Sequence, residues 1–90
     1  MLLKSNDGVM LNQLGTYYNK KGNYNKMKQY YLMAIDNGNV DAMYNLGEHY
    51  GHVGENYDEN EQKKYYLMAI KNGSCEAMCG LAFYYYDKKN

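Results

Sequence analysis

Apolar and small residues recur along the chain with the spacing i, i+3, i+4, i+7, which places them on one face of an α-helix. The pattern occurs three times, and each copy has Leu in its second position with a small residue directly after it. The three copies are Leu11, Leu14, Gly15 and Tyr18, then Met43, Leu46, Gly47 and Tyr50, then Met78, Leu81, Ala82 and Tyr85. These segments are predicted as amphipathic helices that each bury one face.

Two further helices are predicted between these segments. The six-letter run Tyr-Tyr-Leu-Met-Ala-Ile at residues 30–35 returns unchanged at residues 65–70. Alone, such a run could be a buried strand, but it lies in segments of about fourteen residues, longer than most strands, and it is rich in strong helix formers. In the first segment the buried face is predicted to comprise Met27, Tyr31, Ala34 and Ile35.

Polar residues and glycines mark the predicted helix ends. Residues that favour the N-cap precede each helix, and glycines that can adopt a left-handed conformation follow three of them. The caps are Asp7, Asn23, Asn39, Asp58 and Ser74, and the glycines are Gly22, Gly38 and Gly73. Glu61 is placed to complete an acidic capping box with Asp58.

A period of about 35 residues lies in the range typical of a solenoid, in which each unit buries its apolar face against its neighbours. We expect one all-α domain over residues 1–90, with a helix tail at 1–5, repeat one at 7–38, repeat two at 39–73 and a half repeat at 74–90. The loop between the two helices of repeat two, at residues 51–57, is longer than its counterpart in repeat one.

The repeated positions resemble the Sel-one-like repeat, a relative of the tetratricopeptide repeat. That family's pattern is an aromatic pair, a small pair, Gly, then Ala, Leu-Gly and Tyr. The matching residues are Tyr30-Tyr31, Ala34, Gly38, Ala42, Leu46-Gly47 and Tyr50, and the series recurs at Asp58, Tyr65-Tyr66, Ala69, Gly73, Ala77 and Leu81. The departures from the pattern are Ile35 and Ile70 for a small residue, Ala82 for Gly, Tyr30 and Tyr65 for Trp, and the short first loop.

The resemblance implies a right-handed superhelix of about two and a half helix-turn-helix repeats. It also implies a non-catalytic scaffold or adaptor that binds other proteins. In related repeats the first helix of each pair lines the concave face, so the residues beside the buried stripe become candidates for binding a protein or peptide. They are Asn12, Thr16, Asn19, Asp41, Tyr44, Glu48, Glu76, Cys79 and Phe83. The alternative is that these residues form only the solvated side of the repeats.

Composition excludes several other classes of partner. Ten basic and ten acidic residues give a formal net charge of zero, so nucleic acid and anionic membrane surfaces are not expected partners. No apolar run approaches the roughly 18 to 20 residues that span a bilayer, and no signal peptide is recognisable. Cys75 and Cys79 lie one helical turn apart, and we expect free thiols. These features favour an intracellular protein.

No enzyme, cofactor or metal site is expected. His49 and His52 lie near Glu48, but a closed zinc site needs four ligands. The chain has no recognisable nucleophile motif and no phosphate-binding glycine loop.

The thirteen tyrosines admit two interpretations. Exposed rings could bind carbohydrate or peptide in a regulatory module, but neighbouring tyrosines on a helix point about 100° apart, so half of them must face inward. Structural packing is therefore favoured. The last predicted helix has no following helix to cover it, so we expect either self-association or that this chain is a segment or truncated relative of a longer repeat array. The residues expected to stay partly uncovered in a monomer are Met78, Phe83 and Tyr84 to Tyr86.

Overall fold

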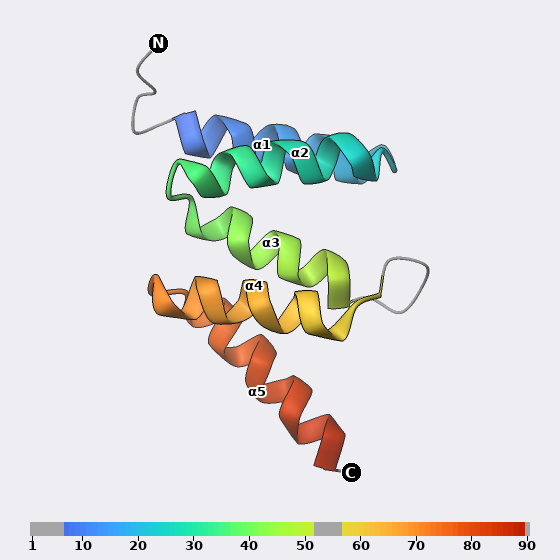
Figure 1. Cartoon of the computed structure of the whole chain (residues 1–90), viewed down its shortest axis with the longest axis vertical. Coiled ribbons are helices and arrows are strands. Elements are labelled where there is room, and N and C mark those ends of the chain that lie inside the picture. Colours follow the sequence, from blue (N-terminus) through green and yellow to red (C-terminus); the bar gives the residue numbers. More distant parts are fainter. Residues whose placement is uncertain (1–6, 52–56, 90) are drawn as a thin grey trace. The chain divides into compact units, whose positions relative to one another are not determined.

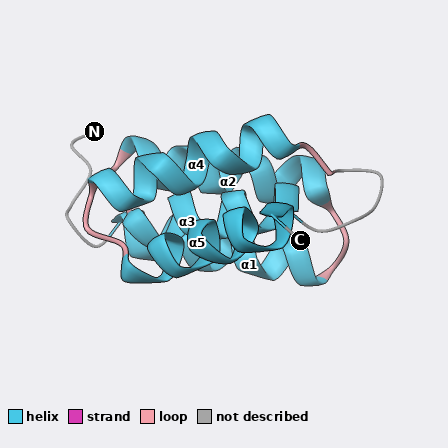
Figure 2. Ribbon diagram, turned by 90° about the horizontal axis from the view of Figure 1, so that it is seen from below, coloured by secondary structure: helices cyan, strands magenta, loops and turns pink. Residues whose placement is uncertain are grey.

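The computed structural model describes residues 7–51 and 57–89, without the side chains of residues 84, 85 and 87–89. Within this part of the chain every regular element is a helix and no strand occurs (Figures 1 and 2), so the all-α prediction is confirmed. The helices are α1 (Asp7–Lys20), α2 (Tyr24–Asp36), α3 (Val40–Gly51), α4 (Glu59–Lys71) and α5 (Cys75–Lys89). The predicted helix tail at residues 1–5 lies outside the described residues.

The chain divides into two compact units between Ala42 and Met43. The first unit contains α1 and α2, and the second contains α4, α5 and all but the first turn of α3. Helices α1 and α2 fall in the range predicted for repeat one, α3 and α4 in that for repeat two, and α5 in the half repeat. The stacking of the repeats into a right-handed superhelix stays a prediction.

The turns after α1, α2 and α4 share one construction. Gly38 has a φ of +79°, the left-handed conformation expected of a helix stop, and the N–H of Asn39 donates to the carbonyl of Ala34 at 3.0 Å. The side chain of Asn39 then accepts a hydrogen bond from the N–H of Ala42 at 2.8 Å. One residue thus closes α2 and caps α3. The same construction occurs at Gly22-Asn23 and at Gly73-Ser74.

The predicted cap of α4 is confirmed, but the capping box is wrong. Asp58 Oδ1 accepts from the N–H groups of Asn60 and Glu61, each at 3.1 Å. A capping box also requires the Glu61 carboxylate to accept from the N–H of Asp58. That N–H instead donates to the carbonyl of Tyr50 at 2.9 Å, while the Glu61 carboxylate lies 3.8 Å from Lys64 Nζ. The hydrogen bond from Asp58 to Tyr50 therefore joins the N-cap of α4 to the last turn of α3.

Asp7 was predicted as the cap of the first helix, but it lies inside the first turn of α1. A carboxylate in this position still stabilises the helix, because the N-terminal end carries partial positive charge.

In the first unit, α1 packs along α2 (Figure 1). A glycine of α1 faces a tyrosine ring of α2 at this contact. A Cβ atom on Gly15 would overlap the ring of Tyr31, which is only 2% exposed. One turn further along α1, the rings of Tyr18 and Tyr30 stack with centroids 5.5 Å apart and planes within 4°. The missing side chain at Gly15 gives the Tyr31 ring the space that it occupies.

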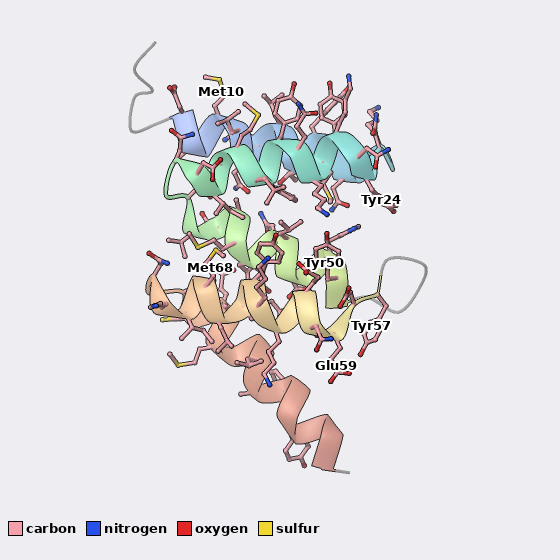
Figure 3. All side chains as sticks on the ribbon, viewed as in Figure 1. Met10, Tyr24, Tyr50, Tyr57, Glu59 and Met68 are labelled. Atoms are coloured by element: carbon pink, nitrogen blue, oxygen red, sulfur yellow. The ribbon has the colours of Figure 1, made fainter. Side chains whose placement is uncertain are left out.

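The second unit repeats this contact between α3 and α4. A Cβ on Gly47 would lie 2.6 Å from Cδ1 of Tyr66, which is 3% exposed. At the end of α3, Tyr50 (labelled in Figure 3) stacks on Tyr65 with centroids 6.0 Å apart. The two six-letter runs therefore occupy equivalent positions in their own units, and the alanine within each run is fully buried.

The pair Tyr65 and Tyr66 faces inward more completely than the prediction that half of the paired tyrosines do so. Both rings are buried, because α3 meets α4 along a surface wide enough to cover two adjacent positions. Tyr66 packs against Gly47, while Tyr65 packs against Tyr50 and has Lys64 Nζ 5.0 Å from its ring centroid.

Helix α5 is less covered than α3. Met78 is 56% exposed, whereas Met43, which has the equivalent place in α3, is 5% exposed. Phe83 and Tyr86 are also exposed large apolar residues, so the predicted lack of cover is confirmed for these three. The side chains of Tyr84 and Tyr85 lie outside the described residues.

Candidate functional site

The predicted interaction residues of the first unit do not all behave as a binding surface. Thr16 Oγ1 donates to the carbonyl of Asn12 at 3.1 Å and lies 2.9 Å from the hydroxyl of Tyr31. Thr16 therefore holds a buried tyrosine in place, a role that its position in the sequence does not reveal. Asn19 and Asp41 are exposed.

In the second unit the structure brings five predicted residues together. Tyr44 and Glu48 of α3 face Glu76, Cys79 and Phe83 of α5 around a hollow of about 450 Å³. Two more residues complete its lining, Cys75 and Gly80. We call this site, defined by these seven residues, the α3–α5 hollow.

Helical spacing could have added the two lining residues that the prediction missed. Cys75 lies one turn before Cys79, and Gly80 lies one turn after Glu76. Each therefore shares a face of α5 with a residue that was singled out. A prediction from single positions beside the buried stripe does not include them.

Tyr66 of α4 packs against residues of both helices that line the α3–α5 hollow. Its ring stacks on that of Tyr44, with centroids 5.8 Å apart and planes 17° apart. On α5, a Cβ at Gly80 would lie 3.2 Å from Cε2 of Tyr66, so the ring also approaches this helix closely. The small residues Gly47 and Gly80 thus let one tyrosine of α4 contact both α3 and α5.

The Glu48 carboxylate interacts with the hydroxyls of both Tyr44 and Tyr66. A hydrogen bond to this carboxylate, then burial and the charges of Glu48 and Glu76, raise the pKa of Tyr44. Burial, followed by the charge of Glu48 and a hydrogen bond to it, raises the pKa of Tyr66 to about 12. Both hydroxyls are therefore protonated at neutral pH and donate to Glu48.

The equivalent places of the two units differ in charge. Thr16 follows Gly15 in α1, and Glu48 follows Gly47 in α3. Both residues hydrogen-bond the tyrosine that packs on the preceding glycine, Tyr31 in one unit and Tyr66 in the other. A neutral hydroxyl in the first unit is thus replaced by a carboxylate in the second.

The residues considered for metal binding do not form a cluster in the described part of the chain. The ring of His49 packs edge-on against Tyr50 with centroids 5.1 Å apart, and His52 lies outside the described residues. Within residues 7–51 and 57–89, no group of three or more His, Cys, Asp and Glu residues could hold a metal ion. Cys75 and Cys79 are free and exposed, as expected.

The large exposed tyrosines lie on several elements. Tyr17 and Tyr24 belong to the first unit, while Tyr57 and Tyr86 belong to the second. The hydroxyl of Tyr57 donates to the carboxylate of Glu59 at 3.4 Å at the start of α4 (Figure 3).

None of the helices, over the residues that are described, is both long and apolar enough to cross a membrane. Comparisons with models of protein families, with curated proteins and with solved structures gave no match. The resemblance to the Sel-one-like repeat therefore depends on this chain's own residues.

Proposed function

We propose that this chain is a non-catalytic protein-interaction scaffold of the Sel-one-like kind, and that the α3–α5 hollow binds a segment of a partner protein. The observation that carries the proposal is the exposed Phe83 ring at a hollow that also presents Tyr44. Phe83 is 71% exposed. Aromatic side chains beside polar groups are the usual anchors of protein interfaces.

The shape of the site supports this proposal. Its volume of about 450 Å³ is comparable to that of small-molecule pockets and is large enough to admit a side chain of a partner. Tyr44 and Glu48 are held by their contacts with Tyr66, so a partner would meet part of the surface already ordered. Preordered side chains lower the entropic cost of binding.

The test places a photo-crosslinking amino acid at Phe83, with Met10 as the control position. Met10 is a large exposed apolar residue of α1, so it matches Phe83 in character but lies outside the hollow. We expect crosslinking at residue 83 to capture a protein that residue 10 does not capture. The affinity of that protein should fall with Phe83→Ala and stay unchanged with Met10→Ala.

Equal affinity for wild type and folded Phe83→Ala would remove the hollow as the binding site. Capture of oligosaccharide instead of protein, followed by tyrosine fluorescence on titration, would favour the alternative function as a carbohydrate-binding module. Phe83→Ala is preferred to Tyr44→Ala, because Tyr44 also stacks on the buried Tyr66 and its loss would disturb the fold.

Exposure along α5 supports a second copy of the chain as an additional partner. Met43 and Gly47 of α3 are buried, and α4 covers Gly47 through Tyr66, whereas Met78 and Ala82 at the equivalent places of α5 are exposed. If the α5 helices of two chains packed about a two-fold axis, each would cover the exposed Met78 and Ala82 of the other. Sedimentation should show concentration-dependent dimers that Met78→Lys abolishes. A wild-type chain that stays monomeric at millimolar concentration would contradict this.

A further inference from the structure

Charge within the α3–α5 hollow is one-sided. Its seven lining residues include two carboxylates, Glu48 and Glu76, and no Lys, Arg or His. The whole chain has equal numbers of acidic and basic residues, so this local excess is not a consequence of composition. Opposite charge on a partner would be attracted to this site.

The carboxylate of Glu48 is not required to hold the buried tyrosine. In the first unit, Thr16 makes the equivalent hydrogen bond to Tyr31 with a neutral hydroxyl at 2.9 Å. Glu48 also lies near the C-terminal end of α3, where the partial negative charge of the helix end disfavours a carboxylate. Helix stability and the contact with Tyr66 therefore do not by themselves account for a charged residue at this position, although the carboxylate also accepts from Tyr44.

Aromatic groups stand beside the two carboxylates. Tyr44 and Phe83 line the same hollow from α3 and α5, and Glu76 is close enough to Tyr44 to influence its hydroxyl. A cation over an aromatic face is stabilised by the negative charge density of the ring. A guanidinium can stack on a ring and donate two parallel hydrogen bonds to a carboxylate, which an ammonium cannot do.

We propose that the α3–α5 hollow binds an arginine side chain of a partner protein, with Glu48 and Glu76 accepting from its guanidinium and with Tyr44 and Phe83 packing on its faces. This rests on the proposed function and specifies the chemistry of the partner. Tyr44 and Tyr66 orient the Glu48 carboxylate by donating to it, so the acceptor is preordered for a planar donor.

The experiment titrates the full ¹⁵N-labelled chain with a short capped peptide that has a central arginine. The matched peptide replaces arginine with citrulline, which has nearly the same shape and no charge. We expect amide shifts confined to residues 44–48 and 75–83, with about tenfold weaker binding of the citrulline peptide and weaker binding of both at high salt. A lysine peptide should bind less tightly than the arginine peptide.

Three variants locate the effect. Glu48→Gln and Glu76→Gln should each lower the affinity for the arginine peptide by about threefold or more. Glu48→Thr introduces the residue that the first unit has at this place, and it should lower the affinity equally while keeping a hydrogen bond to Tyr66. Asp36→Asn, which removes an exposed carboxylate from the other unit, should have no effect. Circular dichroism confirms that each variant is folded.

Equal binding of the arginine and citrulline peptides, shifts outside the hollow, or no binding at millimolar arginine peptide would each overturn this inference. The proposed function fails separately. If a captured partner depends on Phe83 but binds Glu48→Gln and Glu76→Gln normally, the hollow is an interface without a role for charge. If the partner depends on none of these residues, both proposals are wrong.

Discussion

Substitution of Gly47 by Ala tests the contact that joins α3 to α4. The new Cβ would lie 2.6 Å from Cδ1 and 2.8 Å from Cε1 of Tyr66, so the ring must move. Because that ring is buried, stacks on Tyr44 and bonds Glu48, its movement disturbs several contacts. Overpacking of this kind costs about 1–3 kcal/mol, whereas Ala favours a helix over Gly by about 1 kcal/mol. We expect a net loss of about 1–2 kcal/mol, and a larger loss for Gly47→Leu.

Urea denaturation followed by circular dichroism measures this loss, and a double-mutant cycle with Tyr66→Ala assigns it. Without the Tyr66 ring, Gly47→Ala should stabilise the chain by about 1 kcal/mol, because only the helix propensity remains. Gly15→Ala, at the equivalent contact with Tyr31 in the first unit, should behave as Gly47→Ala does. A stabilising Gly47→Ala in the wild-type background would refute the close approach of Tyr66 to α3.

Three further predictions concern the helix ends and the buried tyrosine. Asn39→Ala removes the cap of α3 and should lower the free energy of unfolding by about 1 kcal/mol in urea; a loss no larger than that of the exposed control Asn25→Ala would contradict this role. Gly73→Ala forces a side chain into a φ of +95° and should cost about 1–2 kcal/mol, so an unchanged melting temperature would argue against this turn. The pKa of Tyr66 is raised from 10.0 to about 12, so its contribution to stability is complete below pH 10 and is lost as pH rises towards 12. Ultraviolet titration of wild type against Tyr66→Phe should show this late ionisation, and a missing difference above pH 11 would contradict it.

The helix pattern was predictable because its signals are local. Gly38 and Asn39 determine where α2 ends and α3 begins through bonds within a few residues, and such bonds depend little on the rest of the fold. The repeat added a second kind of information. Since the run containing Tyr31 recurs around Tyr66, two copies had to satisfy the same packing, and their small residues indicated where the helices approach.

The failed predictions concern partners that are distant in sequence. Glu61 has the spacing of a capping box, but the N–H of Asp58 donates its hydrogen bond to the carbonyl of Tyr50 instead. Adjacent tyrosines on a helix point about 100° apart, yet both Tyr65 and Tyr66 are buried, because Tyr50 stacks on Tyr65 as well. Periodicity gives the direction of a side chain on its own helix, but it does not give the width of the surface that another helix covers.

For the candidate site, as for the helices, the sequence predicted which residues share a face but not every contact between helices. Helical spacing placed Tyr44 and Glu48 on one face of α3 and Phe83 on one face of α5, and the structure brings those faces together. Spacing alone did not show that the hydroxyl of Tyr66 reaches this surface from α4. That contact depends on Gly47, where the absence of a side chain opens a path for the ring.

The two copies of the repeat allow structural and functional needs to be separated within one chain. Gly15 and Gly47 are identical because each must admit a tyrosine ring, and substitution of either should affect folding first. Thr16 and Glu48 make the same contact with different chemistry, so the contact itself does not require a charge. The partial negative charge at the end of a helix disfavours a carboxylate there, while the hydrogen bonds from Tyr44 and Tyr66 stabilise the carboxylate of Glu48. Under the proposed function, the charge of Glu48 serves recognition of the partner, whereas Gly47 serves the packing of α3 on α4.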